Sequence, residues 1–175
     1  MGVGDSRQNE VLIKNSSINP IPLSIPTIFK SFCKIEYGET ISSGFLIKFF
    51  KRTKDFFCLM TNEHVITKDM IKKRRTITLY YDSEAKIREI DLFPDERYIK
   101  DFTDINMDIV VIEIIPQDEI SKDYFLIPAI EFMFNYHLLK NKEIIILQYP
   151  NDQLSYSVGE IIDINENEFT HLAKY

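Results

Sequence analysis

The sequence of 175 residues lacks any long hydrophobic run, contains only two cysteines, and has fewer basic than acidic residues. No stretch of about 18 apolar residues occurs, so no bilayer-spanning helix is expected. Lys and Arg number 21 against 27 Asp and Glu, which gives a formal net charge of −6. Proteins that bind nucleic acid mainly by neutralising phosphates carry the opposite balance, so no nucleic-acid partner is expected.

The two cysteines, Cys33 and Cys58, are too few and too isolated for a disulfide scaffold or a zinc site. Neither belongs to a Cys-x-x-Cys pair, and neither has a pair of histidines beside it. We therefore expect both thiols to be small buried hydrophobic groups in a cytoplasmic chain that uses no metal and no cofactor.

The N-terminal segment, residues 1–27, is expected to be extended or disordered. Its first ten residues are polar and lack the apolar core of a secretory signal, and its three prolines disfavour a helix. Gly2, with Ser6 four residues later, fits the permissive pattern for N-myristoylation. A disordered start or an accident of the gene model is the favoured alternative, and a single acyl chain at Gly2 would give only weak membrane association.

From residue 28 onward, short segments of β-branched and aromatic residues alternate with turn residues, which is typical of antiparallel sheet. The predicted strands are residues 28–36, 42–51, 55–61, 76–81, 86–92, 108–115, 143–149, 154–165 and 168–173. Residues 125–130 are a weaker strand candidate, 132–139 a candidate helical turn, and only 64–71 has a helical pattern. About ten strands with almost no helix predict an all-β fold, either a sandwich or a pair of barrels.

Two titratable residues stand at the ends of predicted strands. His64 follows strand 55–61, so its imidazole projects from a strand end instead of a core. Such a histidine can accept a proton from a nucleophile if a carboxylate orients its other nitrogen. Asp108 begins the apolar strand 108–115, and a partly buried carboxylate there needs a donor such as an imidazole N–H. Asp104 is a competing carboxylate, which is disfavoured because it does not adjoin the buried strand.

Four segments, taken in order, resemble the trypsin-like (chymotrypsin-fold) serine peptidases. They are the Gly-containing hairpin strand 42–47, the Thr-Asn-x-His-Val strand end in 59–66, the Asp-led apolar strand in 107–114, and the Tyr-Pro turn with its hairpin in 144–161. The resemblance as a whole covers residues 28–173. The resemblance implies that His64 is the general base and later the general acid, while Asp108 holds its tautomer and stabilises the imidazolium.

The resemblance also implies a domain division. It predicts a chymotrypsin-like double β-barrel with a complete first barrel at residues 28–115, a connection at 116–142 and an incomplete second barrel at 143–175. A barrel removes unpaired edges by closing its sheet. We therefore expect residues 120–175 to be less stable than the first barrel and prone to pair with another chain.

The sequence departs from the family at the nucleophile. No Gly-x-Ser-Gly sequence occurs in it. Ser43 precedes His64 in the first hairpin, and Ser155 and Ser157 precede the position expected for a nucleophile and fall within a predicted strand. We expect the chain to end before the nucleophilic serine and the oxyanion-hole segment, and therefore not to hydrolyse peptides by itself.

Three functions remain open. The first is a trypsin-like serine endopeptidase that acts on polypeptides and is active only if a continuation supplies the serine. The second is a non-catalytic pseudoprotease or peptide-binding β-barrel module. The third is an unrelated β-barrel interaction domain in which His64 and Asp108 do not meet. The other two histidines, His137 and His171, are interpreted as a surface residue of the connection and a residue of the last strand.

Overall fold

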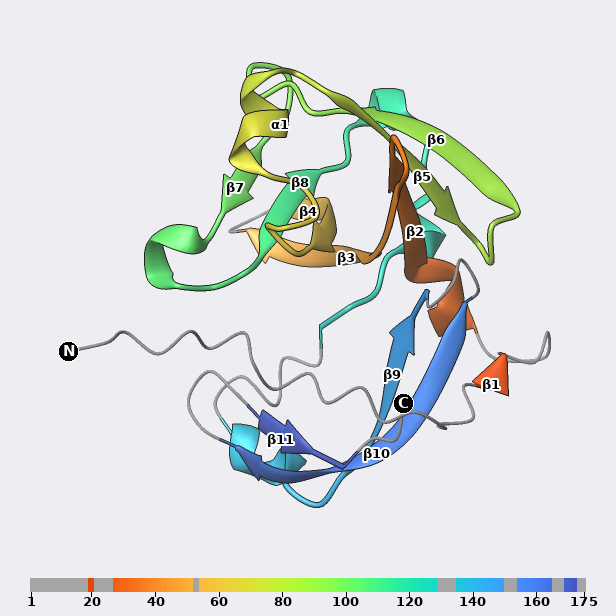
Figure 1. Cartoon of the computed structure of the whole chain (residues 1–175), viewed down its shortest axis with the longest axis vertical. Helices are drawn as coiled ribbons and strands as arrows, with labels where there is room; N and C mark the ends of the chain where they lie inside the picture. The colour runs from red at the N-terminus through yellow and green to blue at the C-terminus, as the bar shows by residue number, and fades with distance from the viewer. Residues whose placement is uncertain are drawn as a thin grey trace.

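The computed structural model describes residues 19–20, 27–51, 54–128, 135–149, 154–164 and 169–172. In these residues the chain is mainly β-strand and forms a seven-stranded antiparallel sheet and a smaller four-stranded sheet (Figure 1). The predicted all-β class is confirmed. Gly2 and the rest of residues 1–18 lie outside the described residues. No helix in the described part of the chain is long and apolar enough to cross a bilayer.

The larger sheet curls into a half-barrel (Figure 1). It consists of β2 (Phe32–Tyr37), β3 (Thr40–Lys51), β4 (Lys54–Thr61), β5 (Thr76–Tyr81), β6 (Lys86–Asp91), β7 (Ile99–Asp101) and β8 (Val110–Glu113). The order across the sheet is β6-β5-β2-β3-β4-β8-β7. Within the described residues the ladder ends at β6 on one side and at the three-residue β7 on the other. Within the described residues the sheet is thus an open half-barrel, and not the complete first barrel that the resemblance implies.

The smaller sheet is centred on β10 (Ser155–Ile164). It pairs with β9 (Glu143–Gln148) on one side, and with β1 (Asn19–Pro20) and β11 (Phe169–His171) elsewhere along its length. Stacked rings of Phe32 and Tyr149, 5.6 Å apart, connect the two sheets. Both rings are buried, so this contact is part of the interface between the sheets.

Hydrophobic alternation explains the strands of the larger sheet. β5 buries Ile77, Leu79 and Tyr81, while the side chains between them are less buried, as expected for a two-residue period. β8 buries three consecutive residues, Val110 to Ile112, because both faces of this strand are covered. Cys33 and Cys58 are fully buried, which confirms that they are core residues, and desolvation raises the pKa of the Cys33 thiol.

Several predicted boundaries need correction. The only α-helix in the described residues, α1 (Lys68–Lys72), begins four residues after His64, because the Thr67 hydroxyl caps it by accepting from the backbone N–H of Met70 at 3.3 Å. Residues 125–128 form no strand and contribute a single bridge from Leu126 to β3. The 3₁₀ turns are η1 (Thr27–Ser31), η2 (Thr103–Ile105), η3 (Pro116–Asp118), η4 (Lys122–Tyr124) and η6 (Tyr136–Leu139).

A buried ion pair fixes the end of β8. The Arg97 guanidinium donates to both carboxylate oxygens of Asp118, at 2.8 and 2.9 Å, and to the backbone carbonyl of Glu113 at 3.0 Å. Asp118 also accepts from the backbone N–H of Ile115 at 2.8 Å. The two side chains are only 4% and 5% exposed. If one partner is removed, water therefore cannot solvate the charge of the other.

We predict that Arg97→Met lowers the free energy of unfolding by about 3–5 kcal/mol, because it leaves the Asp118 carboxylate buried without its partner. Urea denaturation of the purified chain measures this. The double variant Arg97→Met/Asp118→Leu is the matched control, and it should recover much of the loss. A double variant no more stable than Arg97→Met would contradict the assignment of the loss to the unpaired charge.

We also predict that amide hydrogens in residues 120–175 exchange faster than those in β3 and β4. Within the described residues, the main core cluster draws its members from Cys33 to Phe125, and the smaller sheet exposes Ile145, Val158 and Phe169 to solvent. Less buried apolar area gives a lower local free energy of opening. Hydrogen exchange followed by mass spectrometry tests this, and uniform protection across both parts would contradict it.

Candidate active site

The antiparallel pairing of β4 with β8 brings His64 and Asp108 to one end of the sheet. Thr61, the last residue of β4, is opposite Val110, the first residue of β8. In an antiparallel pair, residues that follow one strand lie beside residues that precede the other. His64 therefore lies close to Asp108, although Asp108 precedes β8 instead of beginning it as predicted.

The two side chains are in direct contact. Nδ1 of His64 lies 2.5 Å from Oδ2 of Asp108, and the backbone N–H of His64 donates to Oδ1 of the same carboxylate at 3.0 Å. The side chains of His64 and Asp108 are 71% and 49% exposed. The structure thus places the two residues within hydrogen-bonding distance, at a position accessible from solvent.

The side-chain amide of Asn62 donates two hydrogen bonds to Asp108. Its Nδ2 donates to the backbone carbonyl of Asp108 at 3.0 Å and to Oδ2 of the carboxylate at 3.3 Å. The Thr61 hydroxyl donates to the backbone carbonyl of Ser43 at 2.7 Å, which joins the end of β4 to β3. These hydrogen bonds join the end of β4 both to β3 and to the Asp108 segment.

The electrostatics of Asp108 follow from these contacts. Burial raises the pKa of its carboxyl, but hydrogen bonds from the backbone and side chain of His64 and from the backbone of Glu63 outweigh burial and hold the pKa below its usual value. Asp108 is consequently an anion at neutral pH. An anionic carboxylate only accepts hydrogen bonds, so Nδ1 of His64 must carry the proton. This leaves the Nε2 lone pair of a neutral His64 free to accept a proton.

An ion pair anchors the chain segment that follows His64. Nζ of Lys68 in α1 lies 3.1 Å from Oδ1 of Asp101 in β7. Hydrogen bonds from Thr103 and Lys68 lower the pKa of Asp101 to about 2. α1 is thereby joined to the strand that pairs with β8, so the segment carrying His64 is attached to the sheet at both of its ends.

The remaining candidates lie elsewhere. Asp104 pairs with Lys100, with 3.3 Å between Nζ and Oδ2, and makes no contact with His64 in the described residues. Ser155 and Ser157 are buried on β10. His137 is exposed in η6, and His171 ends β11. The described residues contain no group of three His, Cys, Asp or Glu arranged to hold a metal ion.

Two features of the site were not predicted from the sequence. β7 is too short to give a hydrophobic pattern, so the Lys68–Asp101 ion pair had no detectable signal. Asn62 did have a signal in the sequence, because it stands two residues before His64, at the end of the strand that pairs with the Asp108 segment. Its contact with Asp108 could be predicted only once the register of β4 and β8 was known.

We predict that the Asp108 carboxyl titrates below the usual value of about 3.9, and that His64→Ala raises its pKa only in part, because the backbone N–H of residue 64 still donates. The folded-state pKa lies below the unfolded one, so this stabilisation is present above the unfolded pKa and is lost as pH falls through the folded pKa. Carbon-13 NMR titration measures both values, with His137→Ala as control. An unchanged Asp108 pKa in His64→Ala would contradict the pairing.

Comparisons with known proteins give no match: no family model, no curated protein and no solved structure matches the chain.

Proposed function

We propose that His64 and Asp108 are the acid–base pair of a trypsin-like serine endopeptidase site and that this chain is a homologue of that family. The observation that carries the proposal is the contact of 2.5 Å between His64 Nδ1 and Asp108 Oδ2, two residues that follow β4 and precede β8. The order of the four resembling segments, 42–47, 59–66, 107–114 and 144–161, supports the same proposal.

The roles follow from the hydrogen bonds. Nε2 of His64 would take the proton of an attacking hydroxyl as a general base and return it to the leaving amine as a general acid. Asp108 would keep Nδ1 protonated and stabilise the imidazolium that forms after the proton transfer. Asn62 and the His64 backbone N–H would hold Asp108 in position.

Hydrolysis also needs a nucleophile and oxyanion donors. The 175 residues contain no Gly-x-Ser-Gly sequence. We therefore propose that the chain as given is inactive towards peptides, and that a segment outside these residues would have to supply the serine.

A second candidate function is a peptide-binding module without chemistry. The exposure of the His64 and Asp108 side chains, 71% and 49%, favours it, because catalytic groups work best where water is excluded. In this case the two residues would be structural, and replacing His64 would leave peptide binding unchanged.

The reactivity of His64 can be tested on this chain with p-nitrophenyl acetate, an activated ester that a free imidazole nitrogen attacks. We predict that His64→Ala removes most of the esterase rate and that Asp108→Asn lowers it severalfold, because the carboxylate no longer fixes the tautomer. His137→Ala is the matched control, since His137 is also exposed. Equal losses in His64→Ala and His137→Ala, with no effect of Asp108→Asn, would show that His64 is an ordinary surface histidine.

Sequencing of the transcript beyond codon 175 separates the two candidate functions. A continuation that encodes a Gly-x-Ser-Gly turn, in a protein whose casein hydrolysis is abolished by His64→Ala and by replacing that serine with alanine, would support the endopeptidase. A stop codon directly after Tyr175 would support the binding module.

A further inference from the structure

The outer edge of β6 has no partner strand in the described residues. β6 is the last strand of the larger sheet and pairs only with β5 (Figure 1). Just beyond it, the backbone N–H of Leu92 donates to the carbonyl of Arg75 at 2.8 Å, so the even-numbered residues direct their backbone groups to β5. Backbone groups alternate between the two sides of a strand. Ile87, Glu89 and Asp91 therefore direct theirs to the open edge.

A hollow of ≈ 460 Å³ adjoins this open edge. Its lining comes from β6, from the turn that follows β6 and from η3, and it includes Glu89, Asp91, Glu96, Arg97, Gln117 and Asp118. The volume is in the range of ligand-binding clefts in proteins. Because Glu89 and Asp91 both line it, the hollow lies beside the backbone groups that point away from β5.

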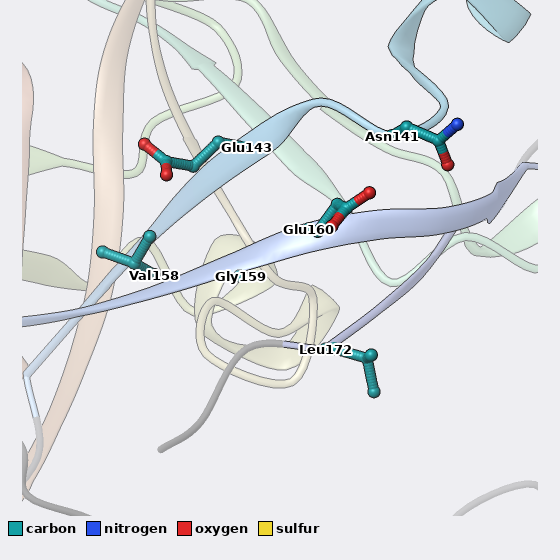
Figure 2. A pocket seen from close by; sticks show the side chains of 6 residues that line it. All are labelled: Asn141, Glu143, Val158, Gly159, Glu160 and Leu172. Atoms are coloured by element: carbon teal, nitrogen blue, oxygen red, sulfur yellow. The ribbon is translucent and has the colours of Figure 1, made fainter.

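A different hollow lies on the smaller sheet. It has a volume of ≈ 420 Å³ and contains Glu143 and Glu160, which are opposite each other on paired strands (Figure 2). There β10 pairs with β9 over residues 155–160, and its other side carries β1 and β11. Among the described residues this leaves no open edge as long as that of β6.

The hollow beside β6 has an excess of negative charge. The buried arginine and aspartate in its lining neutralise each other, which leaves the carboxylates of Glu89, Asp91 and Glu96. Glu89 forms no ion pair within the described residues, and the Asp91 carboxylate accepts from the neutral Thr76 hydroxyl at 2.7 Å. Glu96 lies 3.9 Å from Nη2 of Arg74. A ligand that complements these three carboxylates is positively charged.

The buried guanidinium in the lining also has a donor without an acceptor. Nη1 and Nη2 of Arg97 donate to the Asp118 carboxylate and to the carbonyl of Glu113. Nε of Arg97 is buried and has no hydrogen-bond partner in the described part of the chain. Buried donors in proteins normally have a partner. This donor is a second feature, independent of the carboxylates, that indicates an occupant, and it requires an occupant with an acceptor oxygen.

We propose that the open edge of β6 binds an extended, basic segment of another protein. The segment pairs antiparallel with β6, so that its amides and carbonyls bond to the backbone of Glu89 and Asp91, as in other cases where a peptide adds a strand to a sheet. Residues opposite each other in an antiparallel pair share a face. A Lys or Arg opposite Glu89 or Asp91 therefore lies beside a carboxylate.

The charges of β6 disfavour a second copy of the chain as the occupant. Two antiparallel copies of β6 can pair only through Ile87, Glu89 and Asp91, and each such register places like charges opposite each other. Registers centred near Glu89 or Asp91 oppose two carboxylates. Registers centred nearer to Ile87 oppose Arg88 to itself or to Lys86. Like charges directly opposite each other destabilise an antiparallel pair, so the edge favours a basic partner strand over its own copy.

This edge is separate from the candidate active site. Ile115 and Asp118, which line the hollow, follow β8, whereas Asp108 precedes it. The hollow and His64 are therefore at opposite ends of β8, and the binding of a basic strand does not depend on the proposed function.

Fluorescence anisotropy with short peptides on the full chain tests the proposal. The probe is Lys-Thr-Lys-Thr-Lys, labelled with fluorescein at its N-terminus and amidated at its C-terminus, and we expect saturable binding. Glu-Thr-Glu-Thr-Glu is the matched control and should not bind. N-methylation of the lysine amides should abolish binding, because in the antiparallel pair these amides face β6. N-methylation of the threonine amides, which face away from β6, should leave binding unchanged.

Variants of the chain locate the binding edge. Glu89→Gln/Glu96→Gln removes two exposed carboxylates and should weaken binding of the basic peptide about fivefold, because it removes the charge attraction across the strand pair. Glu39→Gln is the matched control, since Glu39 is an exposed carboxylate in the turn between β2 and β3, and it should bind the peptide as the unmodified chain does.

Several results would overturn the proposal: no binding at millimolar peptide, equal binding of the basic and acidic peptides, or equal losses from the two N-methylations. Equal weakening by Glu39→Gln and by the double variant would also overturn it, because the attraction would then belong to the whole surface. A chain that sediments as a dimer, which the basic peptide dissociates, would make a second copy the occupant. If the double variant fails to fold, the four peptides on the unmodified chain still decide the question.

Discussion

The pairing of β4 with β8 is the constraint on which the candidate site depends. It places the ends of two strands, separated by more than forty residues of chain, side by side. In the strand order β3-β4-β8-β7, the outer strands β3 and β7 lie on either side of the site. Thr61 forms a hydrogen bond with β3, and Lys68 forms an ion pair with β7. A shift of one residue in this register would separate the His64 imidazole from the Asp108 carboxylate, since it would turn every side chain of β8 to the opposite face.

The two sheets differ in how their edges are protected. The larger sheet ends at β6, which carries Lys86, Arg88 and Glu89, and at β7, which has only three residues. Charge and short length are the usual protections of an edge strand. The smaller sheet has an isoleucine-rich β9 and exposed apolar side chains on β10. Its stability is therefore expected to depend more strongly on what else covers these side chains.

Most strands could be predicted from the sequence because their apolar residues alternate or run together. β5 was predicted to the residue and β4 to within one. Helix α1 was misplaced because the His64 segment forms a turn whose first backbone bonds go to the Asn62 carbonyl. β7 and the open edge of the sheet could not be predicted, because both depend on which strands pair. His64 and Asp108 were found by chemical type and strand position, while Asn62 needed the register. The roles of the pair and the domain division at residues 116–142 stay predictions.

The tautomer of His64 tests the central claim most directly. Nitrogen-15 NMR of the histidine-labelled chain at a pH where the imidazole is neutral distinguishes a protonated Nδ1 from a protonated Nε2. The pairing with an anionic Asp108 predicts that Nδ1 carries the proton, and that this preference disappears in Asp108→Ala. A neutral His64 protonated mainly at Nε2, or a tautomer ratio indifferent to Asp108→Ala, would contradict the account.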